Sequence, residues 1–180
     1  MGEIRSDVTP VLLFCGALYN DSDAYEEAKR RMSFEWGPVL LASESFNFDH
    51  TDYYQGEMGN EIKRVFLAFR NLITPSELAL SKVVSSQIEQ DLSRAGKRRV
   101  NLDPGYLHQA KVVLASSKDY SHRIYLDRGI YGEVTLAFSG GTYRVFEWTY
   151  PDYREERVLS FFNHARRLYV EQLKLGVSGT

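Results

Sequence analysis

The segment 97–133 carries polar and charged residues at places where an ordinary core segment would carry apolar ones. Its first motif, NLDPGY at 101–106, places the amide of Asn101 and the carboxylate of Asp103 beside a Pro-Gly pair. Proline fixes φ and glycine accepts positive φ, so the motif predicts a turn that presents both side chains. Gly105 would let the backbone approach a ligand. The alternative is an Asx turn in which Asp103 bonds only its own backbone.

A second motif, KDYSHR at 118–123, has the residue types of an anion site. Lys118 and Arg123, with Lys111 earlier in the chain, could hold a phosphate or carboxylate, because arginine binds such groups as a two-pronged fork. Histidine titrates near neutral pH, so His122 could act as acid or base. The alternative is a solvated loop between strands, where Lys, Asp and Ser are common.

Two further charged residues stand in unusual places. Glu133 lies inside a predicted strand, so it is either on an exposed face or paired with a basic residue in a pocket. Arg154 follows Pro151 and Asp152 in the first turn of a predicted helix. A positive charge there is unfavourable to the helix dipole, which indicates that Arg154 serves another contact.

A metal-dependent hydrolase is a third possibility. Asp49, His50 and Glu57, with His122, are acceptable ligands for a divalent metal. Their spacing matches no metal motif, so we assign no metal ligand and name no cofactor. The motifs GxxxxGK[ST], GxGxxG, GxSxG and HExxH do not occur, which argues against the enzyme classes that they mark.

The hydrophobic pattern predicts seven strands and three helices. The continuous apolar run VLLFCGALY at 11–19 is typical of a central strand buried on both faces. Helix starts are expected from Asp23 with Glu26, from Thr74 with Pro75, and from Pro151. The expected strands are 11–19, 39–48, 61–73, 109–115, 123–126, 131–138 and 142–148, and the expected helices are 23–34, 75–95 (ended by Gly96) and 151–176.

This order predicts an α+β fold. Its first six elements match a ferredoxin-like βαββαβ core, which an antiparallel meander and a C-terminal helix extend. A doubly wound parallel fold is less consistent, because the strands within 122–148 have no helices between them. With no repeat or linker, residues 1–180 are expected to form a single domain.

Composition excludes several classes. The chain is 43% apolar and 26% charged with a net charge of -2, so we expect no DNA partner and no membrane partner. Cys15 is the only cysteine, which suits a reducing, cytoplasmic location. The N-terminus has no secretory signal, and no apolar run reaches the 18 or so residues of a membrane span.

Four motifs are distinctive: NLDPGY (101–106), ASSKDYSHRIYL (115–126), GIYGEVTL (129–136) and YPDYR (150–154). Through them the chain resembles the prokaryotic domain of unknown function 4416 family over nearly its whole length. Some members of that family carry a GTP-binding label, but no nucleotide-binding motif occurs here. The resemblance implies a single domain and leaves the activity open.

These patterns predict a protein that binds or acts on an anionic small molecule, phosphorylated compounds and nucleotides included. The expected catalytic residues are His122, Asp103 and Glu133, and the expected ligand-binding residues are Asn101, Lys111, Lys118, Arg123 and Arg154. Whether a reaction is catalysed, and the oligomeric state, stay open. The alternative is a non-catalytic RNA- or protein-interaction module with Tyr125 and Tyr131 on a sheet face beside the basic run 97–99.

Overall fold

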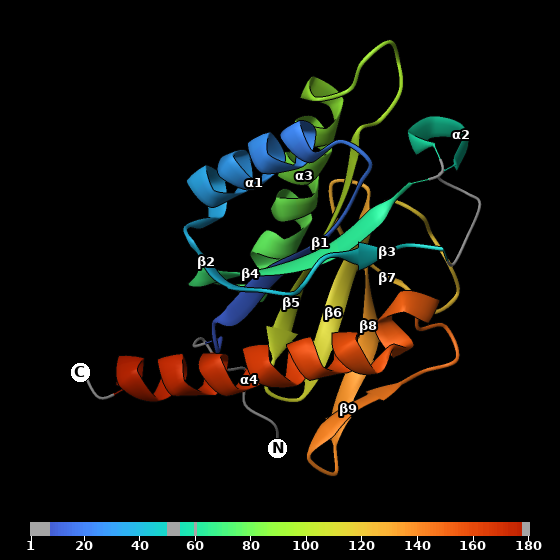
Figure 1. Cartoon of the computed structure of the whole chain (residues 1–180). Coiled ribbons are helices and arrows are strands. Elements are labelled where there is room, and N and C mark those ends of the chain that lie inside the picture. Colours follow the sequence, from blue (N-terminus) through green and yellow to red (C-terminus); the bar gives the residue numbers. More distant parts are fainter. Residues whose placement is uncertain (1–7, 50–54, 60, 178–180) are drawn as a thin grey trace.

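The computed structural model of the chain describes residues 8–49, 55–59 and 61–177 (Figure 1). The strands are β1 (Val11–Tyr19), β2 (Val39–Ala42), β3 (Phe46–Asn47), β4 (Lys63–Ile73), β5 (Val100–His108), β6 (Lys111–Ser116), β7 (Ile124–Asp127), β8 (Ile130–Ser139) and β9 (Thr142–Val145). The helices are α1 (Ser22–Trp36), α2 (Gln55–Met58), α3 (Leu78–Asp91) and α4 (Glu156–Val177), with short 3₁₀ turns η2 (Pro75–Glu77) and η3 (Pro151–Arg154).

Within the described residues, nine strands form one sheet in the order β2-β4-β1-β5-β6-β8-β7, with β3 added to β4 and β9 to β8. Every pair of neighbouring strands is antiparallel. The predicted mixture of helices with an antiparallel sheet and a C-terminal helix is confirmed at this level. None of the described helices combines the length and the apolar character that a membrane span requires.

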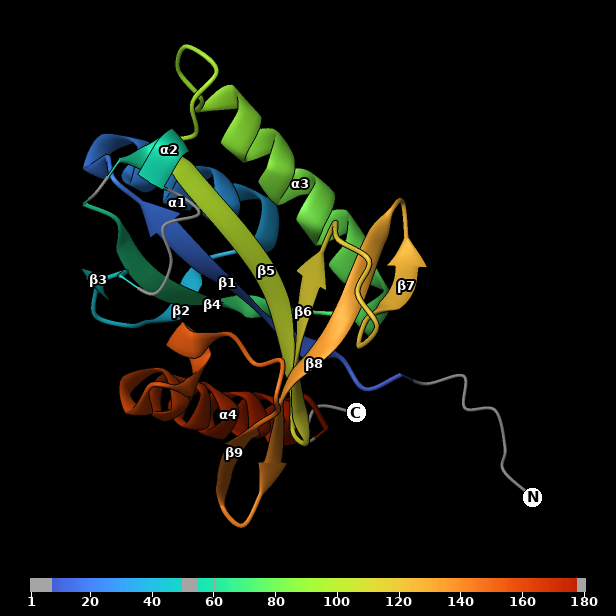
Figure 2. The same cartoon turned by 90° about the vertical axis from the view of Figure 1, so that its right-hand side faces the viewer.

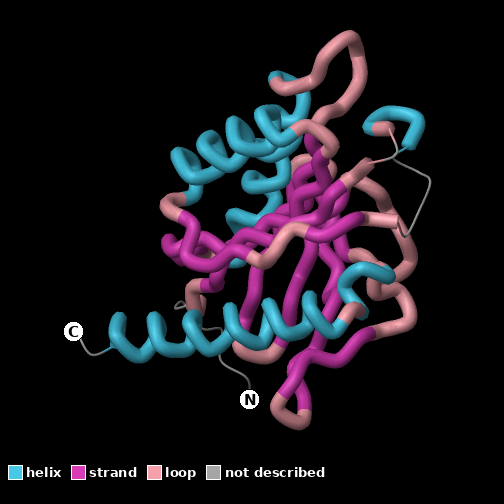
Figure 3. The backbone as a smooth tube through the Cα atoms, in the orientation of Figure 1, coloured by secondary structure: helices cyan, strands magenta, loops and turns pink. Residues whose placement is uncertain are grey.

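Strand β1 is the centre of the packing, as its apolar run predicts. All nine of its residues are buried. Because successive side chains of a strand point to opposite faces, Leu13 and Cys15 pack beneath α1 and α3, whereas Leu12 and Phe14 pack toward α4. Phe14 meets Phe162 of α4 edge-on, with 4.9 Å between ring centres. Figures 1 and 3 show α1 and α3 on one side of the sheet and α4 on the other.

The turns of the predicted meander are confirmed. Arg128 and Gly129, with φ of 52° and 75°, join β7 to β8, and Gly140 and Gly141, with φ of 60° and 84°, join β8 to β9. Two consecutive residues with positive φ match the right-handed twist of a hairpin. The meander therefore extends the sheet beyond β5.

Three local predictions need correction. Helix α1 begins one residue earlier than predicted, because the Asp21 carboxylate accepts the N–H of Ala24 at 2.9 Å and acts as the cap. The predicted strand 39–48 is interrupted after Ala42, where the Ser43 hydroxyl accepts the N–H of Phe66 at 2.9 Å. Gly96, expected to end α3, lies instead in the tight turn that follows it.

The predicted turn at Asp103-Pro104-Gly105 is wrong, since β5 runs straight through it (Figure 2). Strand β5 pairs with β1 from Val100 to Leu107, but its register with β6 begins only at Gly105. Proline has no N–H to donate, so Pro104 stands where the ladder toward β6 ends. At position 105 a glycine is required because neighbouring atoms leave no room for a side chain, and not because the chain turns there.

We predict that Gly105→Ala destabilises the protein. A Cβ at this position would lie 2.5 Å from Cζ of Phe14 and 2.6 Å from the carbonyl oxygen of Val113, and a backbone atom cannot move aside. Such overpacking lowers the free energy of unfolding by about 3 kcal/mol, measurable by urea denaturation. Gly176→Ala is the control, because nothing lies within 4 Å of its added Cβ. Equal stability of the two variants would contradict this account of Gly105.

Candidate functional site

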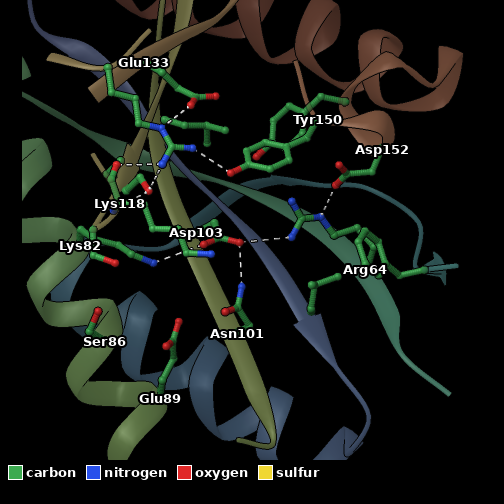
Figure 4. A pocket seen from close by; sticks show the side chains of 18 of the residues that line it. Arg64, Lys82, Ser86, Glu89, Asn101, Asp103, Lys118, Glu133, Tyr150 and Asp152 are labelled. Atoms are coloured by element: carbon green, nitrogen blue, oxygen red, sulfur yellow. Dashed lines mark hydrogen bonds and ion pairs between the residues drawn. The ribbon is translucent and has the colours of Figure 1, made fainter. Parts of the chain in front are cut away.

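A cavity of about 440 Å³ occupies the fork where β5 and β6 part (Figure 4). Pairing between the two strands ends at Gly105 and Leu114. Beyond that point Asn101 and Asp103 line the cavity from β5, and Ser116 lines it from β6. Helix α3, strands β4 and β8, the segment after β6 and the segment around η3 also contribute lining residues. The cavity therefore lies where the sheet opens and where segments from both of its faces can meet.

Strand register brings distant charged residues onto one face. Residues directly opposite each other on neighbouring strands point to the same side of a sheet. Leu18 of β1 lies opposite both Arg64 of β4 and Asn101 of β5, and Gly16 lies opposite Asp103. A Cβ on Gly16 would lie 2.9 Å from the Arg64 guanidinium, so the glycine leaves the space that this side chain crosses toward β5.

Asp103 is the centre of a cationic cluster. The Lys82 ammonium lies 3.3 Å from Oδ1 of Asp103 and donates to the Leu102 carbonyl at 2.8 Å. Asn101 donates to Oδ2 at 2.7 Å, and Nη1 of Arg64 lies 3.7 Å from the same oxygen. Burial alone would raise the pKa of Asp103, but the charges of Lys82 and Arg64 outweigh it and lower that pKa. The carboxylate is therefore ionised.

Glu89 is the second carboxylate that α3 brings to the cavity region. It is 8% exposed, and its Oε1 accepts the backbone N–H of Leu102 at 2.5 Å. Burial raises the pKa of Glu89 above its ordinary value, although the charge of Lys82 opposes this. Two carboxyl groups in one cavity, Glu89 and Asp103, thus have their pKa values shifted in opposite directions.

Arg123 ties one wall of the cavity together. Its Nε donates to Glu133 at 2.7 Å, its Nη1 to the Ser116 hydroxyl at 2.7 Å and the Lys118 carbonyl at 2.9 Å, and its Nη2 to the Tyr150 hydroxyl at 2.9 Å. Four of its five N–H donors are thereby used inside the protein. Arg123 thus holds the wall in place, and most of the N–H groups of its guanidinium are not free to bind a ligand.

The other partners of Glu133 complete this wall. The Thr135 hydroxyl donates to Oε1 at 2.7 Å, and Nε2 of His122 lies 3.2 Å from Oε2. The His122 ring stacks on Trp148 and on Tyr120, with ring centres 5.3 Å and 5.9 Å away. His122 touches a residue of the cavity wall without lining the cavity itself.

A second buried arginine anchors η3. Nε of Arg64 lies 3.0 Å from Oδ2 of Asp152, and both side chains are about 5% exposed or less. This ion pair joins Asp152, near the start of η3, to strand β4. Tyr153, next in the chain, is 1% exposed, and its ring lies 5.6 Å from the Arg64 guanidinium. Among the described side chains, its hydroxyl finds no hydrogen-bond partner.

Five of the predicted site residues line this cavity: Asn101, Asp103, Lys118, Arg123 and Glu133. Besides His122, two others, Lys111 and Arg154, do not line it. Lys111 is opposite His108, at the closed end of the β5–β6 hairpin, and so lies away from the fork. Arg154 donates to the backbone carbonyls of Phe146, Glu147 and Thr149, which is the additional contact expected of it.

The residues considered as metal ligands are only partly described by the structure. His50 and the side chain of Glu57 lie outside the described residues, and Asp49 is exposed. In the described parts of the chain, no three His, Cys, Asp or Glu side chains are grouped so that they could hold a metal ion.

Sequence reasoning missed the half of the site that comes from β4, α3 and η3. In α3 the apolar Leu80 is 48% exposed, while the polar residues Lys82, Ser85 and Glu89 are buried. These three polar residues recur at helical spacing, which is the signal that could have revealed them. Arg64 stands next to the apolar run of β4, where a buried charge calls for a partner.

We predict that Arg123→Met lowers the free energy of unfolding by about 3 kcal/mol, because it leaves the buried Glu133 carboxylate without its cation. Urea denaturation measures the change. Arg128→Met is the control, since the side chain of Arg128 is 60% exposed and pairs only at the surface with Asp127. If the free energy of unfolding falls equally little in both variants, the network around Arg123 does not stabilise the fold.

The raised pKa of Glu89 predicts a pH dependence. The folded state keeps a proton that the unfolded state has already released, so stability falls as pH rises from ~4.5 through the raised pKa. Glu89→Gln removes this contribution. The difference in unfolding free energy, wild type minus variant, should decrease between pH ~4 and pH ~7. A difference that increases with pH would mean that Glu89 is held ionised.

Comparison with known proteins identifies the family to which the chain belongs. No curated protein and no solved structure matches this chain. Residues 9–169 match the family described as domain of unknown function DUF4416, which is most of the 180 residues and contains the whole cavity. The chain therefore belongs to the DUF4416 family.

Proposed function

We propose that the protein binds, and if it is an enzyme acts on, an anionic small molecule in the cavity between β5 and β6, phosphorylated compounds and nucleotides included. One observation carries the proposal: basic and acidic side chains from separate segments converge on a single cavity. The basic residues are Arg64, Lys82, Arg98, Lys118 and Arg123, and the acidic residues are Glu89, Asp103, Glu133 and Asp152.

The energetics of burial support a binding role. Taking ions out of water costs several kcal/mol each, and well-packed apolar residues often stabilise a core as well as an ion pair does. The buried pairs of Arg64 with Asp152 and of Arg123 with Glu133 are therefore poor devices for stability alone. Charged groups with shifted pKa values around a cavity are the usual mark of a functional site.

The same contacts suggest a division of roles. Lys118 is exposed and Arg98 half-buried, so they are the cations that an incoming anion meets first. Asn101 and Asp103 would orient the ligand, and Asp103, being ionised, would accept a proton in any reaction. His122 would exchange protons with the site through Glu133, which it contacts.

We also propose that the first half of the fold is ferredoxin-like. The strand order β2-β4-β1-β5, with antiparallel neighbours throughout and with α1 and α3 on one face, supports this assignment. Such a core leaves its second face for α4 and for the cavity.

A protein-interaction module is the second candidate function. Strand β7 is at the edge of the sheet and exposes Ile124, Tyr125 and Leu126 by 75%, 57% and 41%. The basic run offers little to an RNA backbone, since Arg98 donates to Asn101 and Arg99 donates to Asp21. The exposed apolar edge therefore favours a protein partner over RNA.

We predict that a thermal-shift screen of nucleotides, phosphorylated metabolites and carboxylates finds a ligand that raises the melting temperature. Lys118→Met should weaken the binding of that ligand about tenfold, because it removes one charge-assisted hydrogen bond. Lys111→Met is the matched control, since Lys111 lies outside the cavity, and it should leave the affinity unchanged. A screen without any stabilising anion, or equal effects of the two variants, would refute the proposal.

A further inference from the structure

The charges of the cavity are arranged from outside to inside. Lys118 is exposed and Arg98 half-buried, so positive charge marks the outer part. The ionised Asp103, with 30% of its side chain exposed, lies between the more deeply buried cations Lys82 and Arg64. Because Lys82 and Arg64 already neutralise the surroundings of Asp103, its carboxylate attracts a neutral hydrogen-bond donor of a ligand more than a further anion. A ligand that suits both zones carries an anion at one end and donors at the other.

We propose that the ligand is a polyhydroxylated anion, a sugar phosphate or a sugar acid, whose anionic group lies near Lys118 and Arg98 and whose hydroxyl groups meet Asp103 and Tyr153. This inference rests on the proposed function and specifies the ligand class of the same site.

Asp103 has the capacity to accept a ligand hydroxyl. An ionised carboxylate offers about four acceptor sites. Asn101 and Lys82 occupy two of them at 2.7 Å and 3.3 Å, while Nη1 of Arg64, at 3.7 Å, is beyond hydrogen-bond distance. The lowered pKa of Asp103 keeps it an acceptor at neutral pH.

Tyr153 supplies an independent observation. Its side chain lines the cavity and is 1% exposed, yet within residues 8–49, 55–59 and 61–177 its hydroxyl has no hydrogen-bond partner. Buried hydroxyl groups are normally satisfied, and one that is not destabilises the empty state. A hydroxyl group of a ligand can both donate to it and accept from it.

The balance of charge favours hydroxyl groups over an ammonium group. Five basic side chains line the cavity against four acidic ones, which leaves a surplus of positive charge. A ligand with one or two negative charges and neutral hydroxyl groups compensates this surplus. A zwitterion such as an amino acid leaves it uncompensated, and a nucleoside triphosphate exceeds it.

Isothermal titration calorimetry with matched pairs tests the inference. Inorganic phosphate is compared with D-ribose 5-phosphate and D-glucose 6-phosphate, and acetate is compared with D-gluconate. We expect the polyol of one pair to bind at least ~10-fold more tightly than its simple anion, which corresponds to one additional good hydrogen bond. The pair that shows the difference identifies the anionic group as a phosphate or a carboxylate.

Two variants connect the effect to the residues. Asp103→Asn should reduce the advantage of the polyol to within ~3-fold, while the simple anion binds equally or more tightly because a repelling charge is gone. Tyr153→Phe should weaken only the polyol and leave the melting temperature unchanged or higher, since the hydroxyl has no partner in the protein. A polyol advantage that survives both substitutions would overturn the inference.

The outcomes separate the two proposals. If a simple anion binds and its polyol binds no more tightly, the inference is wrong while the proposed function stands. If O-phosphoserine binds more tightly than both sugar phosphates, the inner donor is an ammonium group, and the inference is likewise overturned. If neither the simple anions nor their polyols bind, both proposals fail.

Discussion

The missing backbone donor at Pro104 is the constraint on which the rest of the structure depends. Antiparallel strands stay together only while each can exchange N–H and carbonyl groups with its neighbour. Strand β5 does so with β1 along most of its length, but with β6 only from Gly105 onward. The sheet is thereby continuous at one end and forked at the other. The fork admits side chains from α3 and from the segment around η3 into one space.

Two buried arginines then give the fork its shape. Arg64 reaches across β1 to Asp103 and pairs with Asp152 of η3. Arg123 binds Glu133 of β8 and the hydroxyl of Tyr150, which immediately precedes η3. Both arms of the divided sheet are therefore linked to the same short segment. The cost of burying these charges is offset within the protein by their carboxylate partners, which leaves Asp103 as the ionised group that still faces the cavity.

Local signals predicted the fold well where local chemistry decides it. The continuous apolar run of β1, the hairpins at Gly129 and Gly141, and the start of the α3 segment at Thr74 depend on residues close in sequence. The Pro104-Gly105 pair has the same local signal as a turn. Its extended conformation follows instead from contact of Gly105 with Phe14 and β6, and such contacts override turn propensity.

The residues of the candidate site likewise divide into those that local sequence predicts and those that depend on distant contacts. Asn101, Asp103, Lys118 and Glu133 could be predicted, because β5, β6 and β8 follow one another closely in the chain and surround the fork. Arg64 could not, since its place beside Asn101 depends on the register of two strands with β1. Register of this kind is set by the packing of both sheet faces, and no pattern within β4 contains it. Arg64, which is 3% exposed, is thus a buried charge of the site that the sequence conceals.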